Sequence, residues 1–147
     1  MCIRDSLDSS VLLRYLLNAD EALLHIGRDQ KIGSSELLEI ECRRVLQRER
    51  LESRLDDDRY AATITALGDF LGMISILEMD DNVKRRACES FPTVIGTLDA
   101  IHLSSALLWR AASDSELAMF TYDKQPALCA KAVGIANFEP VTPRSSR

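Results

Sequence analysis

Two kinds of hydrophobic pattern alternate along the chain. In the longer segments, apolar residues recur three and four positions apart, which predicts amphipathic helices, whereas short apolar runs predict strands. Helices are predicted at residues 11–17, 20–27, 36–50, 56–71, 80–90, 97–112 and 124–133. Strands are predicted to lead into Leu7 and to cover residues 31–34, 74–79, 117–122 and 135–141.

Strands that alternate with helices predict an α/β fold, with a central parallel sheet and helices on both of its faces. In such sheets, ligands bind beyond the carboxyl ends of the strands, where the strand order reverses. Asp8 follows the first predicted strand, and Asp123 follows the strand predicted at residues 117–122. Both acids are therefore expected at the edge of the sheet where a ligand would bind.

Length and composition limit the protein classes that need to be considered. The 147 residues suit a single domain, and 46% hydrophobic and 28% charged residues are ordinary for a globular protein. The net charge of −5 argues against nucleic-acid binding by bulk electrostatics, but a metal ion can reverse the sign locally.

The cysteine and histidine content argues against zinc. The four cysteines are widely spaced with no C-x-x-C pair, and the chain has two histidines. Reduced thiols are expected, and we see neither a secretory signal nor an apolar run long enough to cross a membrane. These features predict a cytoplasmic protein.

The two ends of the chain differ in character from the rest. Met1–Ser6 carries charges where a strand in the middle of a sheet should be apolar, and it looks like a translated sequencing adapter. We therefore expect this segment to be non-native and give it no functional weight. Residues 142–147 are polar and are expected to form a flexible tail of the single domain at residues 1–147.

Glu41 is the most distinctive of the helical acids. It lies three and four residues after Leu38 and Leu37 and four before Val45, which places it on the buried side of its helix. A carboxylate there must be paired, bound to a metal or neutral. The alternative is a glutamate at the edge of the apolar stripe that reaches solvent. Glu39, by contrast, is expected to pair with Arg43 on the exposed side.

Three aspartates each have a simple local explanation. Asp8, Asp99 and Asp123 could each cap the helix that begins beside it, and Thr97 is a second candidate for the cap near Asp99. The surroundings of Asp99 are nevertheless apolar nearly all round, as in a buried helix. His102, near the same face, is interpreted as a hydrogen-bonded core histidine, with a role as ligand or base as the alternative.

Taken together, the four acids suggest metal chemistry. Two follow parallel strands and two lie on buried helix faces, and converging carboxylates without a His or Cys cluster suit Mg²⁺ or Mn²⁺. Such an ion could activate water against a phosphodiester. The chain has no phosphate-binding glycine loop of the nucleotide-binding types. The arginines that are candidates for phosphate contacts, or simply for solvated helix faces, are Arg14, Arg43, Arg44, Arg48 and Arg50.

The chain resembles the PIN-domain nucleases, and among them the VapC toxins, from Leu7 to Val141. Four ordered motifs carry the resemblance: Leu7-Asp8-Ser9-Ser10-Val11-Leu12, Ser34-Ser35-Glu36-Leu37 running to Glu41, Thr97-Leu98-Asp99-Ala100-Ile101-His102-Leu103, and Thr121-Tyr122-Asp123-Lys124.

The resemblance implies a PIN-like, Rossmann-like three-layer domain with a Mg²⁺ or Mn²⁺ site formed by Asp8, Glu41, Asp99 and Asp123. It implies endonucleolytic cleavage of RNA, with Ser10 and Thr121 as hydrogen-bond partners behind the metal ligands. It further implies the toxin of a toxin–antitoxin pair, a cognate antitoxin protein as partner, and a homodimer.

Two other functions are compatible with parts of the pattern. A PIN-like domain that binds RNA or a protein partner without cutting is one. A response-regulator receiver domain is the other, since it is also a small doubly wound domain with acids at strand ends. Asp8, however, has no neighbouring acid at the end of its strand outside the suspect segment, and residues 74–79 end without an obvious phospho-acceptor.

Overall fold

The computed structural model describes residues 4–21, 23 and 31–137, and all structural statements below concern these residues. Its helices are α1 (Ser9–Asn18), α2 (Leu37–Leu51), α3 (Asp57–Met73), α4 (Asp81–Ala87), α5 (Thr97–Ser113) and α6 (Lys124–Ala132). Its strands are β1 (Arg4–Leu7), β2 (Lys31–Ser35), β3 (Ser75–Leu77), β4 (Leu117–Phe120) and β5 (Ala136–Asn137). Most of the helix predicted at residues 20–27 and the end of the strand predicted at residues 135–141 lie outside the described residues.

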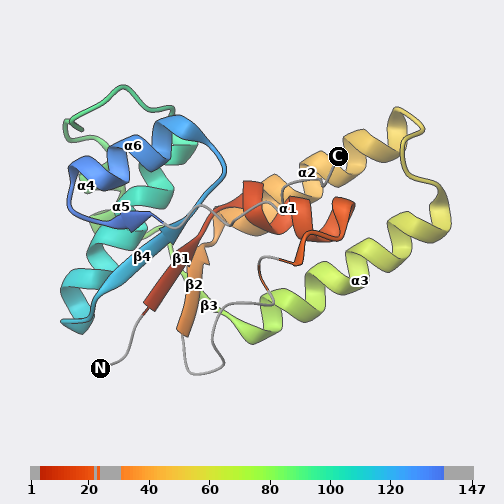
Figure 1. Cartoon of the computed structure of the whole chain (residues 1–147), viewed down its shortest axis with the longest axis horizontal. Coiled ribbons are helices and arrows are strands. Elements are labelled where there is room, and N and C mark those ends of the chain that lie inside the picture. Colours follow the sequence, from red (N-terminus) through yellow and green to blue (C-terminus); the bar gives the residue numbers. More distant parts are fainter. Residues whose placement is uncertain (1–3, 22, 24–30, 138–147) are drawn as a thin grey trace, which may run out of the picture.

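The described strands form one parallel sheet in the order β3-β2-β1-β4-β5. The chain builds the sheet outward from β1 to β3 and then returns to add β4 and β5 on the other side. The strand order therefore reverses between β1 and β4, which lie side by side in Figure 1. This is the position at which parallel α/β sheets bind ligands.

Helices cover both faces of the sheet and give the predicted three-layer α/β architecture (Figure 1). One hydrophobic core joins β1 to α1, α2 and α3, and its fully buried members include Leu7, Leu12, Leu38 and Leu46. The other joins β4 to α5 and α6 through residues such as Leu103, Met119 and Cys129. Helix α4 packs on the outside of α5. No helix of the described part is long and apolar enough to cross a bilayer.

The predicted elements form, but several end earlier than the apolar pattern suggests. Strand β3 stops at Leu77, because its neighbour β2 ends at Ser35 and the chain turns there into α2. The Glu36 N–H still donates to the Leu77 carbonyl, but the Met79 N–H donates to the Glu36 side chain and not to a strand. Strand β4 stops at Phe120, because the Tyr122 N–H donates to the Ser10 side chain instead of to a neighbouring strand. The turn after β4 is therefore held by α1.

Strand β1 occupies the middle of the sheet despite its polar sequence. Asp5 is 1% exposed, and its Oδ2 atom has no hydrogen-bond partner. Burial raises the pKa of this carboxyl to about 6. Arg4 lies over the Trp109 ring, 5.0 Å from its centroid. Of the two charges that made Met1–Ser6 suspect in the sequence, Asp5 is therefore buried in the fold, whereas Arg4 is partly exposed and packs on Trp109.

Candidate functional site

Asp8 lies directly after β1, at the point where the strand order reverses. It is 3% exposed and caps α1, because its Oδ1 atom accepts from the Ser10 N–H at 3.0 Å and from the Ser10 hydroxyl at 2.5 Å. The cap predicted from the sequence is therefore confirmed, but it is not the whole arrangement. The second oxygen, Oδ2, accepts a hydrogen bond from the Thr121 hydroxyl.

Ser10 and Thr121 connect the ends of the two central strands. The Ser10 hydroxyl oxygen accepts from the Tyr122 N–H at 2.9 Å, and the Thr121 hydroxyl oxygen accepts from the Asp123 N–H at 3.1 Å. The two hydroxyl oxygens are 3.5 Å apart. The loop after β1 and the loop after β4 are thus held together around the Asp8 carboxylate.

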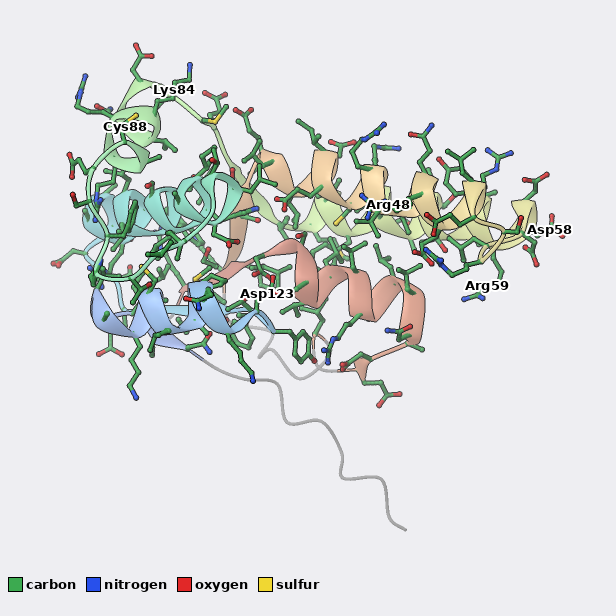
Figure 2. All side chains as sticks on the ribbon, turned by 90° about the horizontal axis from the view of Figure 1, so that it is seen from above. Arg48, Asp58, Arg59, Lys84, Cys88 and Asp123 are labelled. Carbon is green, nitrogen blue, oxygen red and sulfur yellow. The ribbon has the colours of Figure 1, made fainter. Side chains whose placement is uncertain are left out.

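Asp123 is the exposed member of the group. It occupies the N-cap position of α6, but its side chain makes no capping hydrogen bond, contrary to the local explanation from sequence. Figure 2 shows Asp123 near the middle of the molecule, beside the start of α6. Its carboxylate is therefore open to solvent beside the buried Asp8.

Glu41 reaches the same region from α2, where Leu38, Cys42 and Leu46 on the buried side are all fully buried. Its side chain is 20% exposed. One carboxylate oxygen forms a hydrogen bond with His102 Nε2, and the other accepts from the Ser9 hydroxyl at 3.1 Å.

His102 is 3% exposed, so the interpretation as a hydrogen-bonded core histidine is confirmed. The predicted pair between Glu39 and Arg43 is present on the exposed side of α2, at 2.7 Å.

Asp99 lies in the first turn of α5 and is partly buried. The N-cap of this helix is Gly96, and no side chain caps it by a hydrogen bond. The local explanation that Thr97 or Asp99 caps the helix is therefore wrong.

Neighbouring charges act on Asp8 and Asp99. Burial raises the pKa of Asp8, hydrogen bonds from Ser10 and Thr121 oppose that effect, and the negative charge of Asp123 adds to it. The pKa of Asp99 is also raised, first by burial and then by the charges of Asp123 and Glu41. His102 lowers the pKa of both aspartates. Asp123 thus acts on both Asp8 and Asp99, and Glu41 acts on Asp99, although these residues come from α2, α5 and two different loops.

The chemistry of this donor set suits a hard divalent cation, since it consists of carboxylate oxygens. Within the described chain, however, no three His, Cys, Asp or Glu side chains are arranged as a ready-made metal site. Both oxygens of Asp8 and both oxygens of Glu41 are engaged by neighbouring side chains. The structure brings the acids into one region without forming a complete coordination sphere.

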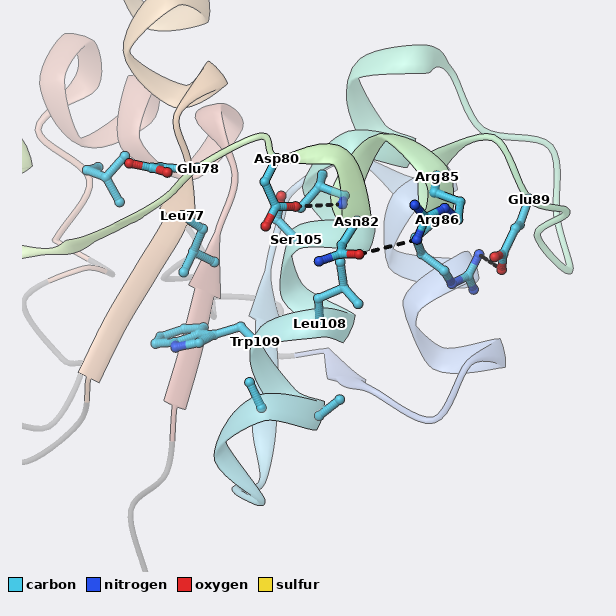
Figure 3. Close-up of a pocket in the computed structure, with 14 residues that line it drawn as sticks. Leu77, Glu78, Asp80, Asn82, Arg85, Arg86, Glu89, Ser105, Leu108 and Trp109 are labelled. Atoms are coloured by element: carbon cyan, nitrogen blue, oxygen red, sulfur yellow. Dashed lines mark hydrogen bonds and ion pairs between the residues drawn. The ribbon is translucent and has the colours of Figure 1, made fainter.

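A large surface pocket lies elsewhere in the described part. It has a volume of about 830 Å³ and is formed between β3, α4 and α5, with Leu77, Trp109 and Arg86 among its lining residues (Figure 3). None of the four carboxylates lines it. The candidate site at the point where the strand order reverses is therefore separate from this pocket.

Sequence reasoning assigned no role to two neighbours of the site, Ser9, which holds Glu41, and Tyr122, which contacts Ser10. It named Arg14 as a candidate phosphate contact but not its position over the Tyr122 ring, with its guanidinium carbon 3.8 Å from the ring centroid. The one available signal is that Ser10 and Arg14 are four residues apart, and so lie on the same side of α1. That Tyr122 would face them depends on the pairing of β1 with β4.

The fold and the acids at its strand ends agree with what sequence comparison finds. The sequence model of the PIN domain matches residues 6–131, and the chain belongs to this family. No curated protein is similar enough in sequence to be matched to the chain.

Solved structures of toxin–antitoxin proteins have the same fold. VapBC2 from Rickettsia felis, bound to a DNA fragment from its promoter, has a TM-score of 0.64 at 13% identity over 92% of this chain and 99% of that one. A toxin–antitoxin complex from Klebsiella pneumoniae has a TM-score of 0.58 at 16% identity, covering 93% and 98%. VapBC-1 from nontypeable Haemophilus influenzae has a TM-score of 0.59 at 10% identity, covering 92% and 97%.

Proposed function

We propose that the protein is a metal-dependent endoribonuclease that hydrolyses RNA phosphodiester bonds, and that Asp8, Glu41, Asp99 and Asp123 hold its Mg²⁺ or Mn²⁺. The observation that carries the proposal is the position of Asp8 where the strand order reverses, with Asp123 close enough for its charge to act on both Asp8 and Asp99, and Glu41 close enough to act on Asp99. The pKa values of Asp8 and Asp99 are raised, and groups with shifted pKa values cluster at functional sites.

The protein's own side chains prepare the site. Ser10 and Thr121 fix both oxygens of Asp8, and His102 and Ser9 fix both oxygens of Glu41. Such supporting hydrogen bonds orient metal ligands. Asp123 stays exposed to solvent, where a nucleic acid could reach it. A bound divalent cation supplies an activated water and neutralises charge on the phosphate.

We further propose that the protein is the toxin of a toxin–antitoxin pair, with a cognate antitoxin as its partner, and that it forms a homodimer. The toxin role and the antitoxin partner are supported by membership of the PIN family and by the toxin–antitoxin structures that share the fold over almost their whole length. The match to the PIN domain also argues against the receiver-domain alternative. The alternative of a PIN-like module that binds without cutting is decided by the following experiment.

The experiment measures cleavage of a mixed tRNA and rRNA pool with Mg²⁺ or Mn²⁺. We expect cleavage by the wild type, none with EDTA, and a loss of about 100-fold or more in Asp99→Asn, since removal of a group that stabilises charge in the reaction costs this much. Asp58→Asn is the matched control, because Asp58 is exposed on α3 far from Asp123 (Figure 2). No cleavage by folded, antitoxin-free wild type would support the binding-only alternative.

A further inference from the structure

Tyr122 is held in place beside the four carboxylates. It lies between Thr121, which donates to Asp8, and Asp123. Its backbone N–H donates to Ser10, and its hydroxyl donates to Asp20 Oδ2 at 2.7 Å. The ring is therefore fixed at both ends, and it lies along α1 next to the site.

Arg14 uses this ring as a support. Its guanidinium carbon is 3.8 Å from the Tyr122 centroid, within the range of a cation–π contact, and the residue is exposed. Ser10, one helical turn earlier on the same side of α1, contacts Asp8 directly. Arg14 thus lies one turn outward from the carboxylates, along the same side of the helix.

The contacts of Arg14 differ from those of other arginines that were named as candidates for phosphate contacts. Arg43, Arg44 and Arg50 each hydrogen-bond to a side-chain oxygen on or near their own helix. Those partners are Glu39, Gln47 and Asp57, respectively. Arg50 also lies over an aromatic ring, with its guanidinium carbon 4.8 Å from the Tyr60 centroid. Arg14 differs because its ring, Tyr122, is bonded through its N–H to Ser10, which contacts Asp8.

We propose that Arg14, supported by Tyr122, binds a backbone phosphate of the RNA strand next to the bond that is cut; this inference rests on the proposed function. The chain carries a net charge of −5, and its site is made of carboxylates that repel RNA. A guanidinium matches two phosphate oxygens with two parallel N–H groups. Because the stacking contact already orders the Arg14 side chain, less conformational freedom is lost when phosphate binds.

This role predicts an effect on substrate binding rather than on the chemical step. A phosphate away from the reacting bond keeps its charge throughout the reaction, so Arg14 holds the substrate and the transition state equally well. Loss of Arg14 is therefore expected to raise KM several-fold and to leave kcat within about twofold of the wild type.

The first measurement is the affinity of the full chain for a fluorescein-labelled oligouridylate in EDTA, followed by fluorescence anisotropy at several salt concentrations. We expect Arg14→Gln to weaken binding about three- to tenfold, and to reduce the slope of log K against log salt by about 0.7, the value for one phosphate contact on a single strand. Arg59→Gln is the matched control, because it removes one positive charge from an exposed position on α3, far from Asp123 (Figure 2). This variant should bind the oligouridylate as the wild type does.

Two Tyr122 variants test whether the ring supports Arg14. Tyr122→Phe keeps the ring under the guanidinium and should bind the oligouridylate nearly as the wild type does. Tyr122→Leu removes the ring and should weaken binding as Arg14→Gln does. The double variant Tyr122→Leu, Arg14→Gln should be little worse than either single one, because the two residues act as one unit. Thermal unfolding of each variant checks that it is folded.

The outcomes separate this inference from the proposed function. If Arg14→Gln matches Arg59→Gln in affinity and salt slope, or if the wild type does not bind the oligouridylate at low salt, the phosphate contact is wrong. Cleavage by the wild type would then still support the nuclease. Conversely, a wild type that binds through Arg14 but cuts no RNA supports the contact and contradicts the cleavage proposal.

Discussion

Single buried side chains orient the carboxylates of the candidate site and also affect the stability of the fold. His102 is an example, because its ring is buried and its Nε2 atom holds one oxygen of Glu41. A glutamate has three rotatable bonds in its side chain, so a fixed partner limits where its carboxylate can point. His102 is therefore a positioning residue for the proposed metal site, acting through Glu41.

Replacing His102 should weaken metal binding without removing a ligand. We expect His102→Ala to lower the affinity for Mn²⁺ about tenfold or more, the usual cost of losing a residue that orients a metal ligand. Isothermal titration calorimetry measures the affinity, and circular dichroism confirms that the variant is folded. His102→Gln, which keeps an N–H donor, should recover part of the loss. Unchanged Mn²⁺ affinity in both variants would contradict this role.

Asp5 makes the opposite kind of contribution, since a buried carboxyl without a full set of hydrogen bonds destabilises the fold. Its pKa is raised from 3.8 to about 6 in the folded state, so the folded chain holds the proton more tightly than the unfolded chain does. The contribution of Asp5 to the free energy of unfolding is therefore most favourable below pH 4, and this contribution is lost as the pH rises through 6.

Asp5→Val should remove this loss and raise the free energy of unfolding at pH 7 by about 1–3 kcal/mol. Asp5→Asn is the control of equal size, which should flatten the pH dependence without adding apolar contact. Urea unfolding at pH 4 and pH 7 measures both effects. A less stable Asp5→Val, or an unchanged difference between the two pH values, would contradict the account.

At the scale of elements, α5 packs closely against the sheet where β2 has a glycine. A Cβ atom on Gly33 would lie 2.6 Å from two carbon atoms of the Trp109 ring, which is too close for any side chain. Trp109 thus fixes the approach of α5, the helix that carries Asp99 and His102, to the middle of the sheet.

Gly33→Ala should lower the free energy of unfolding by about 1–3 kcal/mol, the usual cost of overpacking. Gly68 in α3 provides the matched control, because nothing lies within 4 Å of its added Cβ atom. Gly68→Ala should raise the free energy of unfolding by about 0.5–1 kcal/mol, since alanine favours a helix. Urea denaturation measures both variants, and a Gly33→Ala variant as stable as Gly68→Ala would show that the contact is not tight.

The sequence predicted elements better than it predicted the contacts between them. Apolar spacing is local information, and it placed α2 and α5 to within one residue at each end. The early end of β4 could not be predicted, because it depends on the distant Ser10 side chain. For the same reason, a helix cap explained Asp8 and failed for Asp99, whose environment is set by residues from other elements.

At the scale of the whole molecule, the strand order places the four acids together. Asp8 and Asp123 meet because β1 and β4 are neighbours, and the pKa of Asp99 responds to the charges of Asp123 and Glu41. The joint pattern of acids at strand ends and on buried helix faces indicated this region from sequence. The same pattern could not indicate which side chains would hydrogen-bond to the oxygens of Asp8 and Glu41, namely Ser10, Thr121, Ser9 and His102.

The central claim is that these carboxylates bind a divalent cation, and Mn²⁺ binding followed by electron paramagnetic resonance tests it most directly. We expect the wild type and Asp58→Asn to bind Mn²⁺ with equal affinity, and Asp99→Asn and Asp8→Asn to lose most of that affinity while remaining folded. Equal binding by all four proteins, or no binding by the wild type, would contradict the claim.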